Sequence, residues 1–182
     1  MPVLPRSFYA RPAVEVARAL LGTILAHGKL SGRIVETEAY LGASDPAAHS
    51  YRGVTPRTRV LFGPPGHAYV YLIYGIHDCL NIVAEPEGVA GCVLIRAIEP
   101  CTGITRAADG PGKLTRALAI TLKHNGCDLT HGPVTVSASE PAAAFEIGVS
   151  PRIGITKAAD LPLRFFIKGN RFVSGAKTGL RR

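Results

Sequence analysis

The sequence predicts a mixed α+β fold in a single domain that spans residues 1–182. An amphipathic helical pattern lies near the N-terminus. After it come several apolar or alternating runs bounded by glycine and proline, which are typical of antiparallel strands joined by hairpins. The length of 182 residues is enough to bury a full core without disulfides or metals. We find no repeat or low-complexity tract that indicates a different organisation.

The first helix is predicted after Arg11, because Pro12 suits the first turn of a helix and Gly22 suits its end. Its apolar stripe has helical spacing and consists of Val14, Ala17, Leu20 and Leu21. A short strand at 23–27 then turns through 28–32 into a longer strand, which gives a first hairpin. We expect the helix to pack on the resulting sheet.

The longer strand, residues 33–41, carries two carboxylates and an aromatic ring on one face. Strand alternation places on that face Ile34, Glu36, Glu38 and Tyr40. His49 follows in a turn-rich segment. A glutamate as base, a histidine as polar partner and a tyrosine as stacking surface are the parts that a hydrolytic pocket needs. Most carboxylates on strands are solvated or form ion pairs, so the local pattern leaves both interpretations of Glu38 open.

Residues 68–83 predict a second hairpin. Tyr71 belongs to its first strand, whereas Tyr74 lies beside Gly75 near the tip. Packing in a core is the ordinary explanation for either ring. An exposed tyrosine at the tip, in a basic protein, is instead a candidate wedge that enters a minor groove and unstacks base pairs.

A further strand, 92–98, carries Arg96 among apolar residues, where its partner is either a structural carboxylate or a phosphate. Lys113 lies in a glycine-rich segment before a helix predicted at 116–120. The spacing of that segment does not fit a P-loop, but Lys113 is a candidate for holding one backbone phosphate. The remaining strands are predicted at 134–138, 152–156 and 163–167.

The formal net charge of +8, from 21 Lys and Arg against 13 Asp and Glu, favours polyanions such as nucleic acid or a membrane surface. A basic enzyme with an unrelated substrate has the same charge balance. No apolar run has the length of a membrane span, and the N-terminal residues lack the core of a secretory signal, so we expect a cytoplasmic protein. The four cysteines lack the spacing of a zinc site, so no metal or cofactor is expected. They are Cys79, Cys92, Cys101 and Cys127.

Taken together, the motifs resemble the 3-methyladenine DNA glycosylases of the alkyladenine type. The similar segments keep the family's order over nearly the whole chain: 33–42 (RIVETEAYLG), 47–50 (AAHS), 55–57 (TPR), 69–75 (YVYLIYG), Asn81, 92–100 (CVLIRAIEP), 110–118 and 162–169 (PLRFFIKG). So many collinear motifs make a chance similarity an unsatisfactory explanation.

The resemblance implies a compact domain with a curved antiparallel sheet, flanking helices and a protruding hairpin. It implies Glu38 as the general base that activates water, Arg96 as the group that helps to hold the water and a phosphate, and Tyr74 as the residue that fills the space of a flipped nucleotide. The backbone near Ile155 is a weaker match for a further water-holding carbonyl. The implied base pocket consists of Tyr40, His49, Tyr71 and Asn81, and the implied contacts to the DNA backbone are Arg57 and Lys113. The chain departs from some relatives at His77 and Asp78, which puts the local DNA contacts there in doubt.

The implied function is that of a monofunctional DNA glycosylase of base excision repair. Its partner is double-stranded DNA with alkylated or deaminated purines, and we expect a nucleoid-associated monomer that leaves an abasic site without cutting the strand. One alternative is a nucleic-acid-binding module without catalysis, with Glu36 and Glu38 in structural ion pairs. Another is a hydrolase of nucleosides or sugars, although carboxylates two residues apart on one strand are poorly placed to flank a substrate.

Overall fold

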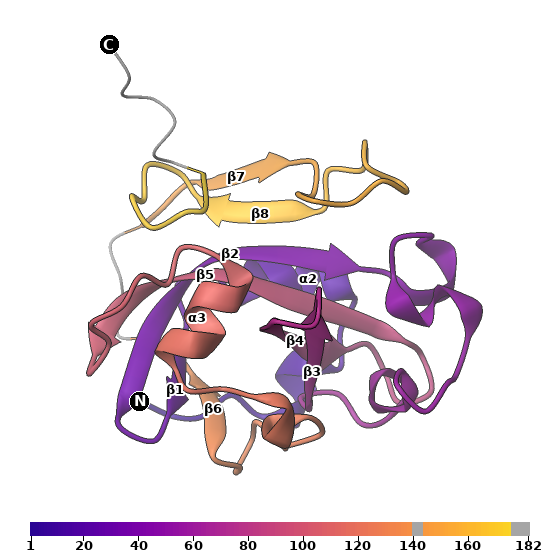
Figure 1. Ribbon diagram of the computed structural model, residues 1–182, viewed down its shortest axis with the longest axis horizontal. Helices are drawn as coiled ribbons and strands as arrows, with labels where there is room; N and C mark the ends of the chain where they lie inside the picture. Colours follow the sequence, from indigo (N-terminus) through magenta and orange to yellow (C-terminus); the bar gives the residue numbers. More distant parts are fainter. Residues whose placement is uncertain (140–143, 176–182) are drawn as a thin grey trace.

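The computed structural model describes residues 1–139 and 144–175 and shows an α+β domain built on a curved antiparallel sheet (Figure 1). The strands are β1 (Ile24–His27), β2 (Leu30–Tyr40), β3 (Ala68–Ile73), β4 (His77–Ala84), β5 (Gly91–Thr102), β6 (Val134–Ser137), β7 (Ile147–Ser150) and β8 (Arg164–Ile167). The α-helices are α1 (Arg6–Tyr9), α2 (Ala13–Ala19) and α3 (Pro111–Ala117). Short 3₁₀ helices are η1 (Gly42–Ser44), η2 (His49–Arg52), η3 (Arg59–Phe62) and η4 (Leu122–His124). The fold class expected from the sequence is confirmed.

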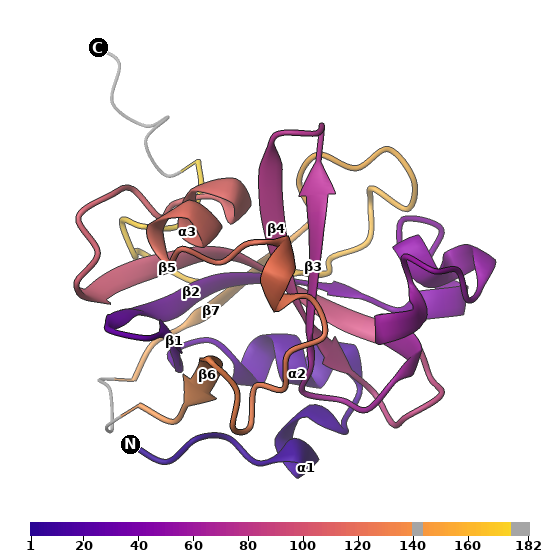
Figure 2. The same cartoon turned by 60° about the horizontal axis from the view of Figure 1, so that its bottom comes forward.

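Strand β2 lies at the centre of the sheet, whose order is β3-β4-β5-β2-β1-β6. One edge of β2 pairs with β5, while β1 and then β8 pair along the other edge, and β7 continues beyond β8. Helices α2 and α3 lie on opposite sides of β2 and β5 (Figure 2). Every residue of β2 from Ile34 to Ala39 is therefore buried, which places polar groups of this strand inside the protein.

Two irregularities in the β2–β5 pairing set the direction of the site residues. Ile34 pairs with Ile98 and Glu36 with Ala97, so Val35 is an extra residue, and Ile34 lies on the core side rather than on the carboxylate side as expected. Thr37 pairs with Ile95, which leaves Arg96 as an extra residue on β5. Such bulges redirect side chains. Here the second bulge allows the Arg96 guanidinium to contact both carboxylates of β2.

The hairpins predicted from the sequence are present. Strands β1 and β2 form the first, and β3 and β4 form the second, which protrudes from the molecule with Tyr74 at its tip (Figure 2). Tyr74 and Gly75 both have positive φ, of 52° and 72°, as the two central residues of a type I′ turn in a β-hairpin require. Tyr74 is 83% exposed, so the tip is not explained by core packing.

Two sequence predictions of element boundaries were wrong. No strand forms at 152–156; the strand is β7, and it ends before Pro151 because the following backbone bonds to side chains, with the Ile153 amide donating to Glu38. Helix α3 begins at Pro111 and ends at Ala117, earlier than the predicted 116–120. Proline at the first helical position explains the start. The positive φ of Ala119, 55°, is incompatible with continuation of the helix.

Cys79 and Cys92 are buried, as expected of thiols that act as small apolar groups. Burial raises the pKa of the Cys79 thiol to about 11 and that of Cys92 to about 12, so both stay protonated at neutral pH. Within residues 1–139 and 144–175, none of the helices has the length and apolar character needed to cross a bilayer.

Candidate active site

A cavity of about 170 Å³ opens beside the second hairpin. All four residues expected in the base pocket line it, and so does Ile155, whose backbone was the weaker match. The lining residues are Tyr40, Ala47, His49, Tyr69, Tyr71, Ile73, Asn81, Cys92, Gly154 and Ile155. They come from the end of β2, the loop after it, the hairpin, β5 and the loop after β7. The roles of these residues remain predictions, but the structure brings them to one place.

Aromatic rings form one side of the cavity and hold one another in place. The His49 ring meets the Tyr71 ring edge-on, with centroids 4.5 Å apart, and its Nδ1 lies 3.0 Å from the Tyr69 hydroxyl. The Asn81 amide donates to the Tyr69 carbonyl at 3.2 Å. Burial, with a smaller effect of the nearby Arg57, lowers the pKa of His49, so this ring is neutral at pH 7. Tyr69 was not predicted as a site residue, although its position two residues before Tyr71 places both rings on one strand face.

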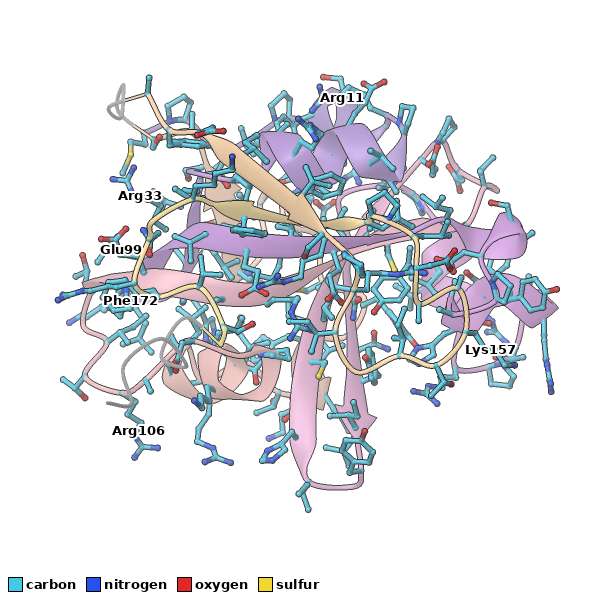
Figure 3. All side chains as sticks on the ribbon, turned by 90° about the horizontal axis from the view of Figure 1, so that it is seen from above. Arg11, Arg33, Glu99, Arg106, Lys157 and Phe172 are labelled. Atoms are coloured by element: carbon cyan, nitrogen blue, oxygen red, sulfur yellow. The ribbon has the colours of Figure 1, made fainter. Side chains whose placement is uncertain are left out.

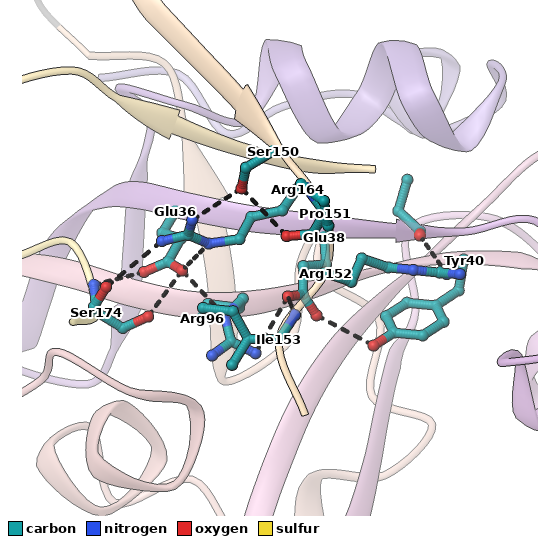
Figure 4. Close-up of polar contacts among 11 residues, drawn as sticks. Glu36, Glu38, Tyr40, Arg96, Ser150, Pro151, Arg152, Ile153, Arg164 and Ser174 are labelled. Atoms are coloured by element: carbon teal, nitrogen blue, oxygen red, sulfur yellow. Dashed lines mark hydrogen bonds and ion pairs between the residues drawn. The ribbon is translucent and has the colours of Figure 1, made fainter. Parts of the chain in front are cut away.

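The Glu38 carboxylate is fully buried next to Tyr40 (Figure 4), and it does not itself line the cavity. Its Oε1 accepts a hydrogen bond of 2.8 Å from the Ile153 amide and lies 3.3 Å from Nη1 of Arg96. Its Oε2 accepts from the Tyr40 hydroxyl at 3.1 Å. Burial raises the pKa of Glu38, while Arg96, the Ile153 amide and the Tyr40 hydroxyl lower it less. The carboxylate is therefore a stronger base than an exposed glutamate.

Glu36 has a different environment, because donors surround both of its oxygens (Figure 4). Nε of Arg96 lies 3.0 Å from Oε1, and Nε of Arg164 lies 2.6 Å from the same atom. The Ser174 amide donates to Oε2 at 2.6 Å and its hydroxyl donates to Oε1 at 2.8 Å. A carboxylate so fully bonded is a structural anion that holds the Arg96 side chain in place. Arg96 itself thus has a structural ion pair as its partner, one of the two possibilities that its sequence context left open.

A buried ion pair between Asp45 and Arg152 joins the loop after β2 to the loop after β7. The guanidinium contacts both carboxylate oxygens, at 2.5 and 2.9 Å, and both side chains are fully buried. Neither residue was predicted from the sequence as part of the site. The sequence gives little sign of this pair, because an aspartate before a proline and an arginine after a proline are ordinary loop residues. Only the fold brings these two positions, 107 residues apart, into contact.

The expected DNA contacts lie outside the cavity. Arg57 is exposed, and its guanidinium carbon lies 5.3 Å from the Tyr71 ring centroid. Lys113 is exposed on α3, where it pairs with Asp109 at 3.1 Å. Together with Tyr74 it lines a second, mostly apolar hollow beside the hairpin. The side chains of Arg106 and Lys157 extend on either side of the hairpin (Figure 3). In the part of the chain that the structure describes, no three His, Cys, Asp or Glu side chains gather as a metal site.

The structure thus places a buried carboxylate beside an aromatic cavity, next to a projecting hairpin, in an α+β domain of net charge +8. The family model described as Methylpurine-DNA glycosylase (MPG) matches residues 7–171. The chain belongs to this family, and it is therefore a DNA glycosylase, a hydrolase that acts on DNA.

Similar proteins carry the name "Putative 3-methyladenine DNA glycosylase". One from Methanoculleus marisnigri is 52% identical, covering 94% of this chain and 98% of its own. One from Rhodopseudomonas palustris is 51% identical, with 95% and 88% covered, and one from Carboxydothermus hydrogenoformans is 49% identical, with 94% and 98% covered. The similarity thus extends over nearly the full length of each protein.

Proposed function

We propose that this protein is a monofunctional glycosylase that excises alkylated or deaminated purines of the 3-methyladenine class from double-stranded DNA. The observation that carries the proposal is the position of Glu38, a basic carboxylate one hydrogen bond behind the aromatic wall of the cavity. Family membership and the names of the relatives support the same chemistry.

The substrate base has to leave the duplex before it reaches such a cavity. Rotation of a nucleotide out of the stack costs a few kcal/mol, least for weakly paired lesions. Tyr74 at the exposed tip is suited to fill the vacated space, and the rings of Tyr40 and Tyr71 are suited to receive the base. Stacking on these rings favours an electron-poor alkylated purine by about 1 to 2 kcal/mol when the pair is desolvated.

In the proposed reaction, the oxygen of a water molecule attacks C1′ of the deoxyribose while the bond to the purine nitrogen breaks. Glu38 accepts a proton from this water, and its charge stabilises the positive sugar. The electrons of the broken bond stay with the base, so an alkylated cationic purine leaves as a neutral molecule. Arg96 keeps 9% of its side chain exposed, whereas Glu38 has none, so we place the approach of water on the Arg96 side of the carboxylate.

The products are a free base and an abasic site. A strand-cutting glycosylase forms a covalent bond between an amine and C1′. Among the described residues, those that line the cavity include no lysine. We therefore propose that the strand stays intact, and that repair depends on a separate enzyme that acts on abasic DNA.

Base release from duplexes that each carry one defined lesion tests this proposal. We expect release of the free base and an abasic site that breaks only after treatment with alkali. Strand breaks without alkali would contradict the monofunctional mechanism, and binding without any base release would favour the non-catalytic alternative. The same set of duplexes ranks methylated adenine, hypoxanthine and ethenoadenine as substrates.

A further inference from the structure

The Tyr40 ring separates the cavity from a buried cation. Tyr40 lines the cavity, whereas the Arg152 side chain is fully buried and lies over the ring, with its guanidinium carbon 4.6 Å from the ring centroid. Figure 4 shows the Arg152 side chain beside the Tyr40 ring. Arg152 does not line the cavity, so the ring face that it covers is closed to a base in the cavity, and we take such a base to stack on the opposite face.

The position of this cation is fixed by its partners. Besides the two contacts with Asp45, Nη1 of Arg152 donates to the Ala39 carbonyl at 3.0 Å. Asp45 is held in turn, because it accepts hydrogen bonds from the amides of Leu41 and Ala47 at 3.2 and 3.0 Å. The guanidinium cannot leave the ring without breaking a buried bidentate ion pair, so its charge is a permanent feature of the cavity wall.

A cation on one face of an aromatic ring weakens the binding of a second cation to the other face. The ring attracts cations through a single quadrupole, and two cations on opposite faces share it and also repel each other through the ring. Asp45 balances the charge of Arg152, but the guanidinium is the end of the pair that contacts the ring. Burial and Glu38 raise the pKa of Tyr40, and Arg152 opposes them, in agreement with its charge acting at the ring.

We propose that Arg152 is a specificity-determining residue that acts through Tyr40 to weaken stacking of cationic bases and so to shift excision toward uncharged damaged bases. This inference rests on the proposed function of the cavity. We therefore expect the enzyme to prefer alkylated, cationic purines less strongly than it would with the same two tyrosines, Tyr40 and Tyr71, but without the cation of Arg152.

A double variant, Arg152→Gln with Asp45→Asn, removes both charges, preserves hydrogen-bonding groups and leaves the net charge of the protein at +8. The readout is the single-turnover rate constant divided by the half-saturating enzyme concentration, on matched duplexes with 7-methylguanine or hypoxanthine. We expect the ratio of cationic to neutral excision to rise roughly three- to tenfold in the double variant. If the native enzyme excises only one of the bases, dissociation constants of the two duplexes replace the rates.

Two single variants, each checked for folding by circular dichroism, extend the test. Asp45→Asn leaves the cation unbalanced, so the ratio should move toward the neutral base. Arg152→Lys keeps the positive charge, so its ratio should stay near that of the native protein. If the double variant fails to fold, the single variants still decide the matter: the ratio should shift toward the neutral base in Asp45→Asn and stay near the native value in Arg152→Lys. A fall or rise in excision that is common to both substrates overturns the proposal.

Arg18→Gln is a matched control. Arg18 is exposed on α2 and lies 5.2 Å from the Phe165 ring, so this change removes another arginine–aromatic contact far from the cavity and should leave the ratio unchanged. If native protein releases no base from either duplex, the proposed function itself fails. Release by the native protein with an unchanged ratio in the folded double variant overturns only the role of Arg152.

Discussion

At Glu38, burial raises the pKa of the carboxylate, the charge of Arg96 and two hydrogen bonds lower it, and burial dominates. The result suits a general base that works near neutral pH, since a base with a higher pKa accepts a proton more readily. Glu36, two residues earlier, accepts hydrogen bonds at both oxygens from Arg96, Arg164 and Ser174. The two carboxylates share a strand face but differ in their chemistry because their neighbours differ.

We predict that Glu38→Gln abolishes base excision and leaves binding to lesion-bearing duplex nearly intact, because the amide preserves the shape but does not accept the proton. A raised pKa in the folded state contributes stability that is fully present below the pKa of the unfolded chain and is lost as pH rises through the higher folded value. The variant should therefore melt no lower than the native protein at pH 7.5. Substantial excision by a folded variant would remove Glu38 from its role.

The same shift predicts a pH dependence. Only the ionised carboxylate accepts a proton from water, so excision should increase with pH through a midpoint above 4.5, the ordinary value for this side chain. Single-turnover rates between pH 4.5 and 8 should be measured on a lesion whose own charge is constant over that range. A midpoint at or below the ordinary value would show that the Glu38 pKa is not raised in the working enzyme.

For Glu36→Gln we predict a loss of stability with a milder effect on catalysis. The change leaves Arg96 and Arg164 without their shared anion, and breaking a buried pair in this way costs roughly 3 to 5 kcal/mol. For a chain of this length that lowers the melting temperature by roughly 10 °C. Excision should be assayed well below the melting temperature; a stronger catalytic defect than that of Glu38→Gln would mean that the base is Glu36.

At the scale of elements, the second hairpin and the bulges beside it determine what the site presents. The extra residue at Arg96 on β5 aims a guanidinium at two carboxylates of the neighbouring strand. The tip places a non-glycine residue, Tyr74, at positive φ, a conformation that a tyrosine adopts at a cost of roughly 1 kcal/mol. A strained and exposed tyrosine is easier to explain by a function of its ring than by stability.

We predict that Tyr74→Ala weakens binding to lesion-bearing duplex and slows excision from it more than from single-stranded DNA. A wedge helps only where a stack has to be opened, so its effect should vanish without neighbouring base pairs. Tyr71→Ala should impair both substrates, because a cavity wall contacts the base whatever its origin.

Tyr74→Gly separates the ring from the backbone strain. It should be at least as stable as the native protein, since glycine tolerates the positive φ, and yet show the same duplex-specific defect as Tyr74→Ala. Circular dichroism and thermal melting establish that each variant is folded. Equal losses on duplex and single strand in a folded Tyr74→Ala would contradict the wedge assignment.

On the scale of the whole molecule, the net charge of +8 supplies attraction to DNA that does not depend on sequence. Lys113 is exposed on α3 beside the hairpin, so we predict that Lys113→Gln weakens binding to damaged and undamaged duplex by similar factors. The slope of the logarithm of affinity against the logarithm of salt concentration should fall by about 1.

Arg18→Gln serves as the control for this prediction as well. It removes the same charge from α2, which lies away from the hairpin tip in Figure 2, and should change the slope little. A loss confined to damaged duplex would place Lys113 in lesion recognition instead of backbone contact. An unchanged slope would show that its pairing with Asp109 persists in the complex.

The sequence by itself determined the fold class, the hairpins β1–β2 and β3–β4, and most strands, because strand periodicity and glycine turns are local signals. Motifs in family order also selected Glu38, Tyr40, His49, Tyr71 and Asn81. Tertiary structure alone decided that Glu36 accepts more hydrogen bonds from side chains than Glu38 does, and that Arg96 contacts both carboxylates. It alone also decided that Asp45 and Arg152 form an ion pair next to the Tyr40 ring. The physical reason is that desolvation and ion pairing depend on residues distant in sequence, which become neighbours only when the sheet and its loops close around them.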